Sequence, residues 1–102
     1  DLNDLLIQKP AATFFVRAKG DSMINAGIYE GDLLIIDRSV SPKSGHIILA
    51  IVNGEFTLKR LLRIGQNISL VAENPKYKPL KILEETAFEV WGVAVHCIHK
   101  IK

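Results

Sequence analysis

The chain has 102 residues, of which 48% are hydrophobic, and its 13 basic and 11 acidic residues give a formal net charge of +2. Since a domain commonly has about 100–150 residues, we expect residues 1–102 to form a single domain. The hydrophobic fraction excludes a disordered chain, and the small charge excess excludes a strongly basic surface, so we expect no direct sequence-specific DNA binding.

The composition also indicates the compartment. No apolar stretch reaches the roughly 18–20 residues of a membrane-spanning helix, and no signal peptide is visible, so we expect a cytoplasmic protein with no membrane partner. The one cysteine, Cys97, cannot form an internal disulfide, and its apolar run VWGVAVHCI predicts a buried structural thiol. Because the chain begins with Asp1 rather than Met, we expect that upstream residues have been removed.

Short apolar segments alternate with turn signals along the chain, which is typical of a mainly β fold. Asn53-Gly54 is the clearest of these signals, because a type I′ hairpin turn needs positive φ at both central residues. Residues 2–7 and 22–27 are the two segments that look helical or turn-like. We therefore expect small twisted sheets with one or two short helical turns. The predicted strands are 13–19, 33–37, 46–52, 55–62, 67–73, 80–83 and 87–101.

The strand 55–62 can be divided into two faces, because side chains alternate along a strand. The face with Phe56, Leu58, Arg60 and Leu62 is more apolar and predicts the core side. The opposite face then contains Lys59, which this pattern places in solvent. Arg60 on the apolar face makes the pattern imperfect.

The three histidines raise the question of a metal site. His96 and His99 are three residues apart, and on a strand such residues point to opposite faces, while His46 stands alone. We therefore expect no metal and no cofactor. A Ser-His-Asp triad is also disfavoured, because the chain has no nucleophile-elbow motif.

Ser22 lies in the stretch KGDSMINAG, between an apolar strand and a short helical turn. Serine in this position is typical of a helix N-cap, where its hydroxyl accepts a bond from a free backbone N–H. A nucleophile is the alternative, and it requires a base from elsewhere in the chain. The local sequence favours the cap, and the nucleophile depends on the rest of the chain.

Taken together, the segments show a pattern of Gly-x-Ser-Met, then Gly-Asp before an apolar strand, then a lysine on the strand after a hairpin. The lysine follows the serine by 37 residues. This pattern resembles the carboxyl-terminal domain of the LexA-type self-cleaving proteins, and among them the UmuD mutagenesis proteins. The starting segment DLNDLLIQKPAATFFVRAKGDSM and the final VWGVAVHCIHKIK are also similar, so the resemblance covers the whole chain. The matching positions are Gly20, Ser22, Met23, Gly31, Asp32 and Lys59.

The resemblance implies a LexA/signal-peptidase-like β-ribbon fold and a serine peptidase with a Ser-Lys dyad. Ser22 would be the nucleophile and a neutral Lys59 the general base, with the backbone N–H groups of Asp21 and Ser22 holding the oxyanion. A lysine has an ordinary pKa of about 10.4, so the fold must desolvate Lys59 for this role.

The resemblance also implies partners and a biological role. UmuD-like proteins cut their own amino-terminal arm when RecA forms a filament on single-stranded DNA, and they are homodimers. The shortened UmuD′ form is the accessory subunit of an error-prone Y-family translesion polymerase with a UmuC-like subunit, in the SOS response to DNA damage. The alternatives are the carboxyl-terminal domain of a LexA- or phage-type repressor, an interaction module with a decayed dyad, and, more remotely, a signal peptidase.

Overall fold

The computed structural model describes residues 12–101 of the chain. Seven strands and one short 3-10 helix alternate with turns, and all neighbouring strands are antiparallel. The expected mainly β fold is therefore confirmed, while the predicted helical turn at residues 2–7 lies outside the described residues. The elements are β1 (Thr13–Arg17), η2 (Ile24–Ala26), β2 (Leu33–Asp37), β3 (Ile47–Val52), β4 (Glu55–Ile64), β5 (Asn67–Val71), β6 (Leu80–Ile82) and β7 (Phe88–Ile98).

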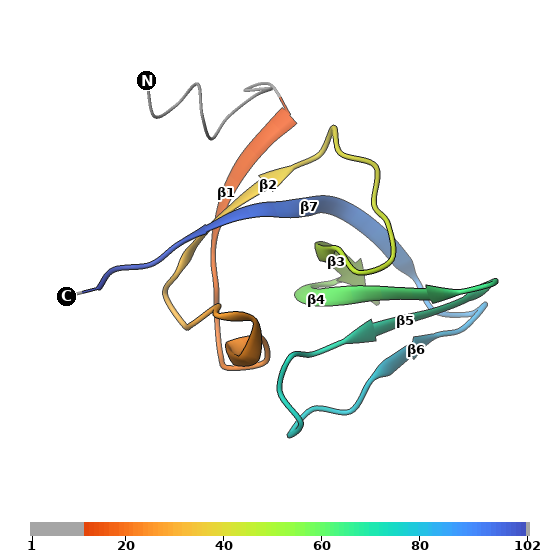
Figure 1. Ribbon diagram of the computed structural model, residues 1–102. Coiled ribbons are helices and arrows are strands. Elements are labelled where there is room, and N and C mark those ends of the chain that lie inside the picture. The colour runs from red at the N-terminus through yellow and green to blue at the C-terminus, as the bar shows by residue number, and fades with distance from the viewer. Residues whose placement is uncertain (1–11, 102) are drawn as a thin grey trace.

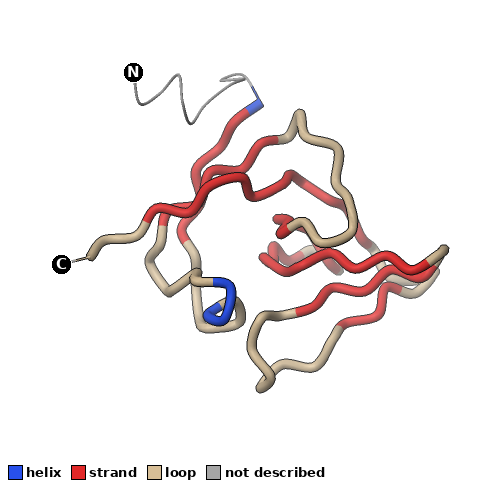
Figure 2. The backbone as a smooth tube through the Cα atoms, viewed as in Figure 1, coloured by secondary structure: helices blue, strands red, loops and turns tan. Residues whose placement is uncertain are grey.

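The strands form one continuous sheet, rather than several small ones, in the order β1-β2-β7-β3-β4-β5-β6. The sheet curls, so that β1, β2 and β7 form one wall and β3 to β6 form the other (Figure 1). The short helix η2 lies beside the end of β1, apart from the strands (Figure 2). Within the described residues, no helix is long and apolar enough to cross a membrane.

The β3–β4 hairpin follows from its turn residues. Asn53 and Gly54 have φ values of 47° and 86°, which are the positive values that a type I′ turn requires. Val52 and Glu55 are paired across this turn, so the turn sets the register of the whole hairpin. The predicted turn is confirmed.

The central strand β3 is covered on both faces, because its side chains alternate between two hydrophobic clusters. Leu49 packs in the first cluster with Met23, Leu34 and Ile36. Ile48, fully buried, packs in the second cluster, which β4, β5 and β7 complete. A strand buried on both faces reads as a continuous apolar run, as IILAIV does.

The long strand β7 joins the two walls by pairing with β3 through its first half and with β2 through its second half. The register shifts once along each pairing, which marks a β-bulge or irregularity and helps the sheet to bend. A Cβ atom at Gly92 would meet Ile36 Cγ2 at 2.4 Å, so the Ile36 side chain occupies the space that a larger residue at position 92 would need.

The predicted core face of β4 is wrong. Leu61 is 7% exposed and belongs to the second cluster, whereas Phe56 is 61% and Leu62 is 38% exposed. The reason is that Leu58 packs against the first cluster while Leu61 packs into the second, so both faces of β4 meet apolar surroundings. A two-residue period cannot select a core side when the sheet has a cluster on each side.

The predicted burial of Cys97 is also wrong, because this cysteine is exposed. β3 pairs with β7 only as far as Val93, and beyond that point β7 has β2 as its one partner in the described sheet. The apolar run continues past the part of the strand that the core covers. The sequence run alone does not reveal where that cover ends.

Candidate active site

Ser22 lies in a tight turn between β1 and η2. Gly20 enters the turn with a φ of 71°, a left-handed conformation that favours glycine. The N-cap position of η2 is occupied by Met23, and no side-chain capping bond is present. The helix-capping interpretation of Ser22 is therefore wrong, and its hydroxyl is available for another role.

Lys59 reaches Ser22 from the opposite wall of the sheet. Its Nζ lies 3.2 Å from Ser22 Oγ, 2.8 Å from Thr57 Oγ1 and 3.2 Å from the carbonyl oxygen of Leu58. β5 pairs with β4 only from Arg60 onward, so in the described sheet Lys59 stands where one edge of β4 becomes unpaired. The prediction that alternation leaves Lys59 in solvent is wrong, because its side chain is half-buried at this edge.

Burial lowers the pKa of Lys59 below its ordinary value of 10.5, because desolvation disfavours the charged ammonium. Within the described residues, no carboxylate forms an ion pair with Lys59 to restore that charge. Its three hydrogen-bond partners are two hydroxyls and a carbonyl, all of them uncharged. The site therefore shifts the lysine next to the serine hydroxyl toward its neutral form.

The backbone N–H groups of the turn differ in their surroundings. The N–H of Ser22 has no acceptor among the described residues. The N–H of Asp21 lies near its own carboxylate and helps to lower the pKa of that group, after the larger effects of Tyr77 and Lys76. Of these two N–H groups, that of Ser22 has no protein acceptor in the described part of the chain, and that of Asp21 is bonded to its own side chain.

A loop after β5 holds the serine turn in place. Asn74, 5% exposed, donates from Nδ2 to the carbonyl oxygen of Asp21 at 2.8 Å. The N–H of Asn25 donates to the carbonyl of Glu73 at 2.9 Å, on the other side of Ser22. These bonds fix the peptide that precedes the nucleophile position. Local sequence reasoning missed Asn74, because its partner is 53 residues away.

The carboxylate of Asp21 completes this attachment at the surface. The Tyr77 hydroxyl donates to it, and Lys76 Nζ lies 3.3 Å from its second oxygen. The hydrogen bond raises the pKa of Tyr77 and lowers that of Asp21, since both partners favour the carboxylate and the intact phenol. These contacts are exposed and add little stability in water.

A cavity of about 390 Å³ opens at Ser22 and Lys59. One side is formed by the end of β1 and the residues that follow it, and the other by the half of β4 that β5 leaves unpaired. Apolar side chains form the floor between these two walls. The lining residues include Arg17, Gly20, Met23, Leu34, Leu49 and Phe56.

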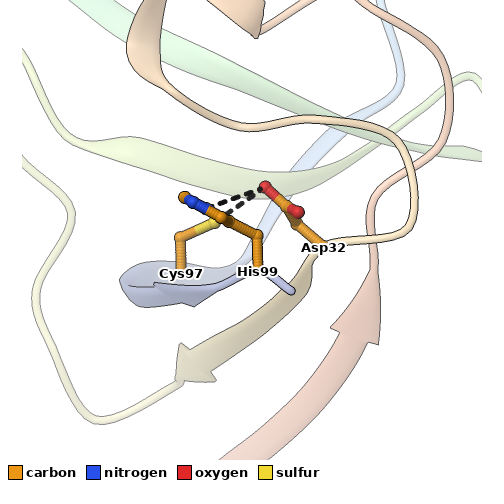
Figure 3. Close-up of side chains that lie close together, drawn as sticks. All are labelled: Asp32, Cys97 and His99. Carbon is orange, nitrogen blue, oxygen red and sulfur yellow. Dashed lines mark hydrogen bonds and ion pairs between the residues drawn. The ribbon is translucent and has the colours of Figure 1, made fainter. Parts of the chain in front are cut away.

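A second group of titratable side chains lies near the end of the segment that links β1 to β2, just before β2. Asp32, Cys97 and His99 offer ligand atoms that all lie within 4.8 Å of one another, and no other such group of three is found in the described chain (Figure 3). Desolvation, with the adjacent Asp32 carboxylate, raises the pKa of the Cys97 thiol to about 11. The expectation of no metal site considered the histidines in pairs and did not include this group.

Comparison with known protein families identifies the class of protein to which this chain belongs. The sequence profile described as Peptidase S24-like matches residues 1–95. The chain belongs to this family, that of the LexA-type self-cleaving serine peptidases, and the family expected from the sequence is confirmed.

Individual relatives place the chain within that family on the UmuD-like side. It is 43% identical to the protein ImpA of Salmonella typhimurium over 103 residues, covering all of this chain and 69% of ImpA. It is 45% identical to the protein SamA of the same species, covering 70% of SamA. The LexA repressor of Photorhabdus laumondii is 38% identical over 93% of this chain and 48% of its own length.

Proposed function

We propose that Ser22 and Lys59 form a Ser-Lys dyad that cuts the protein's own amino-terminal arm. The observation that carries this proposal is the 3.2 Å separation between Lys59 Nζ and Ser22 Oγ, with the pKa of the lysine lowered by burial. A lysine that serves as general base must be neutral near neutral pH. Membership of a self-cleaving peptidase family supports the same assignment.

The reaction proceeds in two steps. Neutral Lys59 accepts the proton of the Ser22 hydroxyl as Oγ attacks the peptide carbonyl, and the protonated amine then gives that proton to the departing amino group as the C–N bond breaks. Water next attacks the Ser22 ester, again with Lys59 as base, and the carboxylate product leaves with Ser22 restored. Thr57 Oγ1, 2.8 Å from Nζ, orients the amine.

The developing oxyanion is held by backbone N–H groups of the serine turn, those of Ser22 and Asp21. Asn74 positions these donors, because it holds the carbonyl of the peptide that joins the two residues. The Asp21 amide would take part if it separates from its own carboxylate, which also has Tyr77 and Lys76 as partners.

The substrate is an extended segment of polypeptide. The stretch of β4 from Glu55 to Lys59 pairs with β3 on one edge and has no partner on the other among the described strands. An extended peptide entering the cavity can hydrogen-bond to such an edge, as added strands do in other proteins. In this proposal, a peptide bound along that edge would have its scissile carbonyl beside Ser22.

The lasting role that we propose is that of a UmuD′-like accessory subunit in the SOS response. In this role, RecA on single-stranded DNA stimulates the cleavage, and the processed homodimer joins a UmuC-like Y-family polymerase in the cytoplasm. Similarity to ImpA and SamA along the full length of this chain supports this role over that of a repressor domain. The LexA similarity keeps the repressor domain as the second candidate, and a DNA-binding domain upstream of Asp1 would favour it.

The dyad is tested with a version of the chain that carries an amino-terminal arm with an Ala-Gly bond. Ser22→Ala and Lys59→Ala are each expected to slow self-cleavage by about 1,000-fold or more, measured by gel and mass spectrometry. Lys59→Arg is expected to be equally inactive, because a guanidinium keeps its proton and cannot act as base.

Stability measurements separate chemistry from folding in these variants. Lys59→Ala is expected to unfold at the same temperature as the parent or higher, because it removes a desolvated amine. Cleavage at the parent rate by either alanine variant would overturn the dyad. The polymerase role is tested separately, by co-purification of the processed chain with a UmuC-like subunit.

A further inference from the structure

The strand register brings two parts of the chain together at the far end of β2. Leu33 pairs with Ile98 and Leu34 with Cys97, so one further step along the ladder sets Asp32 opposite His99. Cys97 and His99 are two residues apart on an extended segment, and their side chains therefore point to the same face. Figure 3 shows both of them directed at the Asp32 carboxylate.

Two of the distances in this group are close to those around a small tetrahedral cation. Cys97 Sγ lies 3.4 Å and His99 Nδ1 lies 3.7 Å from the same oxygen of Asp32, Oδ2. Ligands at about 2.0–2.3 Å from zinc in a tetrahedron are separated from one another by about 3.3–3.7 Å. Small rotations of Cys97 and His99, which are both exposed, bring all three atoms into range.

The charge of the group also favours a cation. Asp32 is 5% exposed, and no lysine or arginine forms an ion pair with it in the described chain. Its other contacts at Oδ2 are the N–H of Tyr29 at 2.8 Å and the thiol of Cys97. A buried carboxylate is costly unless it is paired with positive charge, and among the described residues His99 is the one basic side chain within ion-pair distance.

We propose that Asp32, Cys97 and His99 form a binding site for a divalent transition-metal ion of the zinc type. Thiolate, imidazole and carboxylate are the donors that zinc uses in proteins, and a water would complete a set of four ligands. On binding, the thiol of Cys97 loses its proton to solvent as the sulfur–metal bond forms, with no change of oxidation state. The rings of Tyr29 and His99 pack in a T-shaped arrangement with centroids 5.9 Å apart.

Such a site would fasten the end of β7 to the turn that precedes β2. That turn is bonded in both directions to Ala18, whose N–H donates to Asp32 O and whose carbonyl accepts from Gly31 N. Ala18 is four residues before Ser22. A bound ion would therefore stiffen the segment that leads into the serine turn, without touching the serine or Lys59.

The test uses the chain without a histidine tag, stripped of metal, and titrated with zinc against a coloured chelator. One ion per chain is expected to bind, and cobalt in its place is expected to give the intense visible bands of a tetrahedral site with a thiolate ligand. Cys97→Ser and His99→Gln are each expected to weaken zinc binding by about 100-fold or more, since loss of an outer contact alone costs about 10–100-fold.

His96→Gln is the matched control, because His96 is a neighbouring exposed histidine outside the group. It is expected to bind zinc as the parent does, and zinc is expected to raise the unfolding temperature of both but not that of Cys97→Ser. Absence of stoichiometric zinc binding by the parent overturns the proposal. Equal weakening by His96→Gln and His99→Gln, or a cobalt spectrum unchanged by Cys97→Ser, overturns it as well.

Discussion

Two groups of titratable side chains flank the segment between β1 and β2, and burial affects them in opposite ways. At Lys59 the fold removes water from a cation, and no described carboxylate pairs with it, so its pKa is lowered toward the neutral base. At Asp32 the fold buries a carboxylate beside a thiol and an imidazole, so positive charge is favoured. The comparison shows that burial alone does not define a site. Its chemistry also depends on whether the buried group is an acid or a base and on which charged groups lie near it.

The largest effect expected from this contrast is on the reactivity of Cys97. Its pKa is raised from 9.0 to about 11, so at pH 8 the thiolate fraction falls from about one in ten to about one in a thousand. In metal-free buffer, Cys97 in the folded chain is expected to react with iodoacetamide about 100-fold more slowly than in the urea-unfolded chain. Mass spectrometry over time measures both rates. Equal rates would mean that neither burial nor the Asp32 carboxylate raises the pKa of the thiol.

The pH dependence of self-cleavage tests the group around Lys59. The rate is expected to rise about tenfold per pH unit below the lowered pKa of Lys59 and to level off above it, at a pH below 10.5. The free energy of unfolding also rises with pH in this range. Between the folded and unfolded pKa values, Lys59 keeps its proton in the unfolded chain and has lost it in the folded chain. Unfolding free energy therefore gains a rising contribution between the two pKa values. Lys59→Met is the control for stability, since it should remove that contribution. A cleavage rate of the parent protein that does not change with pH would contradict a neutral Lys59 base.

A smaller effect is expected at Asn74, which holds the peptide before Ser22. Asn74→Ala removes a buried hydrogen bond, at a cost of about 1–2 kcal/mol in unfolding free energy. Self-cleavage is expected to slow by about tenfold through misplacement of the turn, with the pH profile unchanged because Lys59 keeps its surroundings. Lys76→Ala, which removes an exposed contact to the same Asp21, is expected to change stability by less than about 0.5 kcal/mol. A shifted pH profile in Asn74→Ala would argue against a purely positioning role.

Much of the strand pattern was predictable from local sequence, since turn residues punctuate it. The strand Leu33–Asp37 and the Asn53-Gly54 turn lie where the sequence predicts them, because φ preferences and continuous apolar runs act over a few residues. The faces of β4 and the burial of Cys97 were not predictable in this way. They depend on which strands lie on each side, and those neighbours come from distant parts of the chain.

The candidate site divides in the same manner. Ser22 and Lys59 were identified from a resemblance in motif and spacing, while their local patterns favoured a helix cap and a solvent-facing lysine. The structure brings the two side chains to 3.2 Å, and it adds Thr57 and Asn74, which no motif had indicated. Hydrogen bonds between residues 37 and 53 positions apart leave no periodic trace in the sequence.

By itself, the sequence determined a mainly β chain, the hairpin at Asn53-Gly54 and the family pattern around Ser22 and Lys59. These depend on backbone preferences and on residue types at fixed spacing. The tertiary structure alone decided which charges lose their water, because desolvation depends on everything packed around a group. Packing in the curled sheet lowers the pKa of Lys59. The same sheet brings Cys97 and His99 next to Asp32.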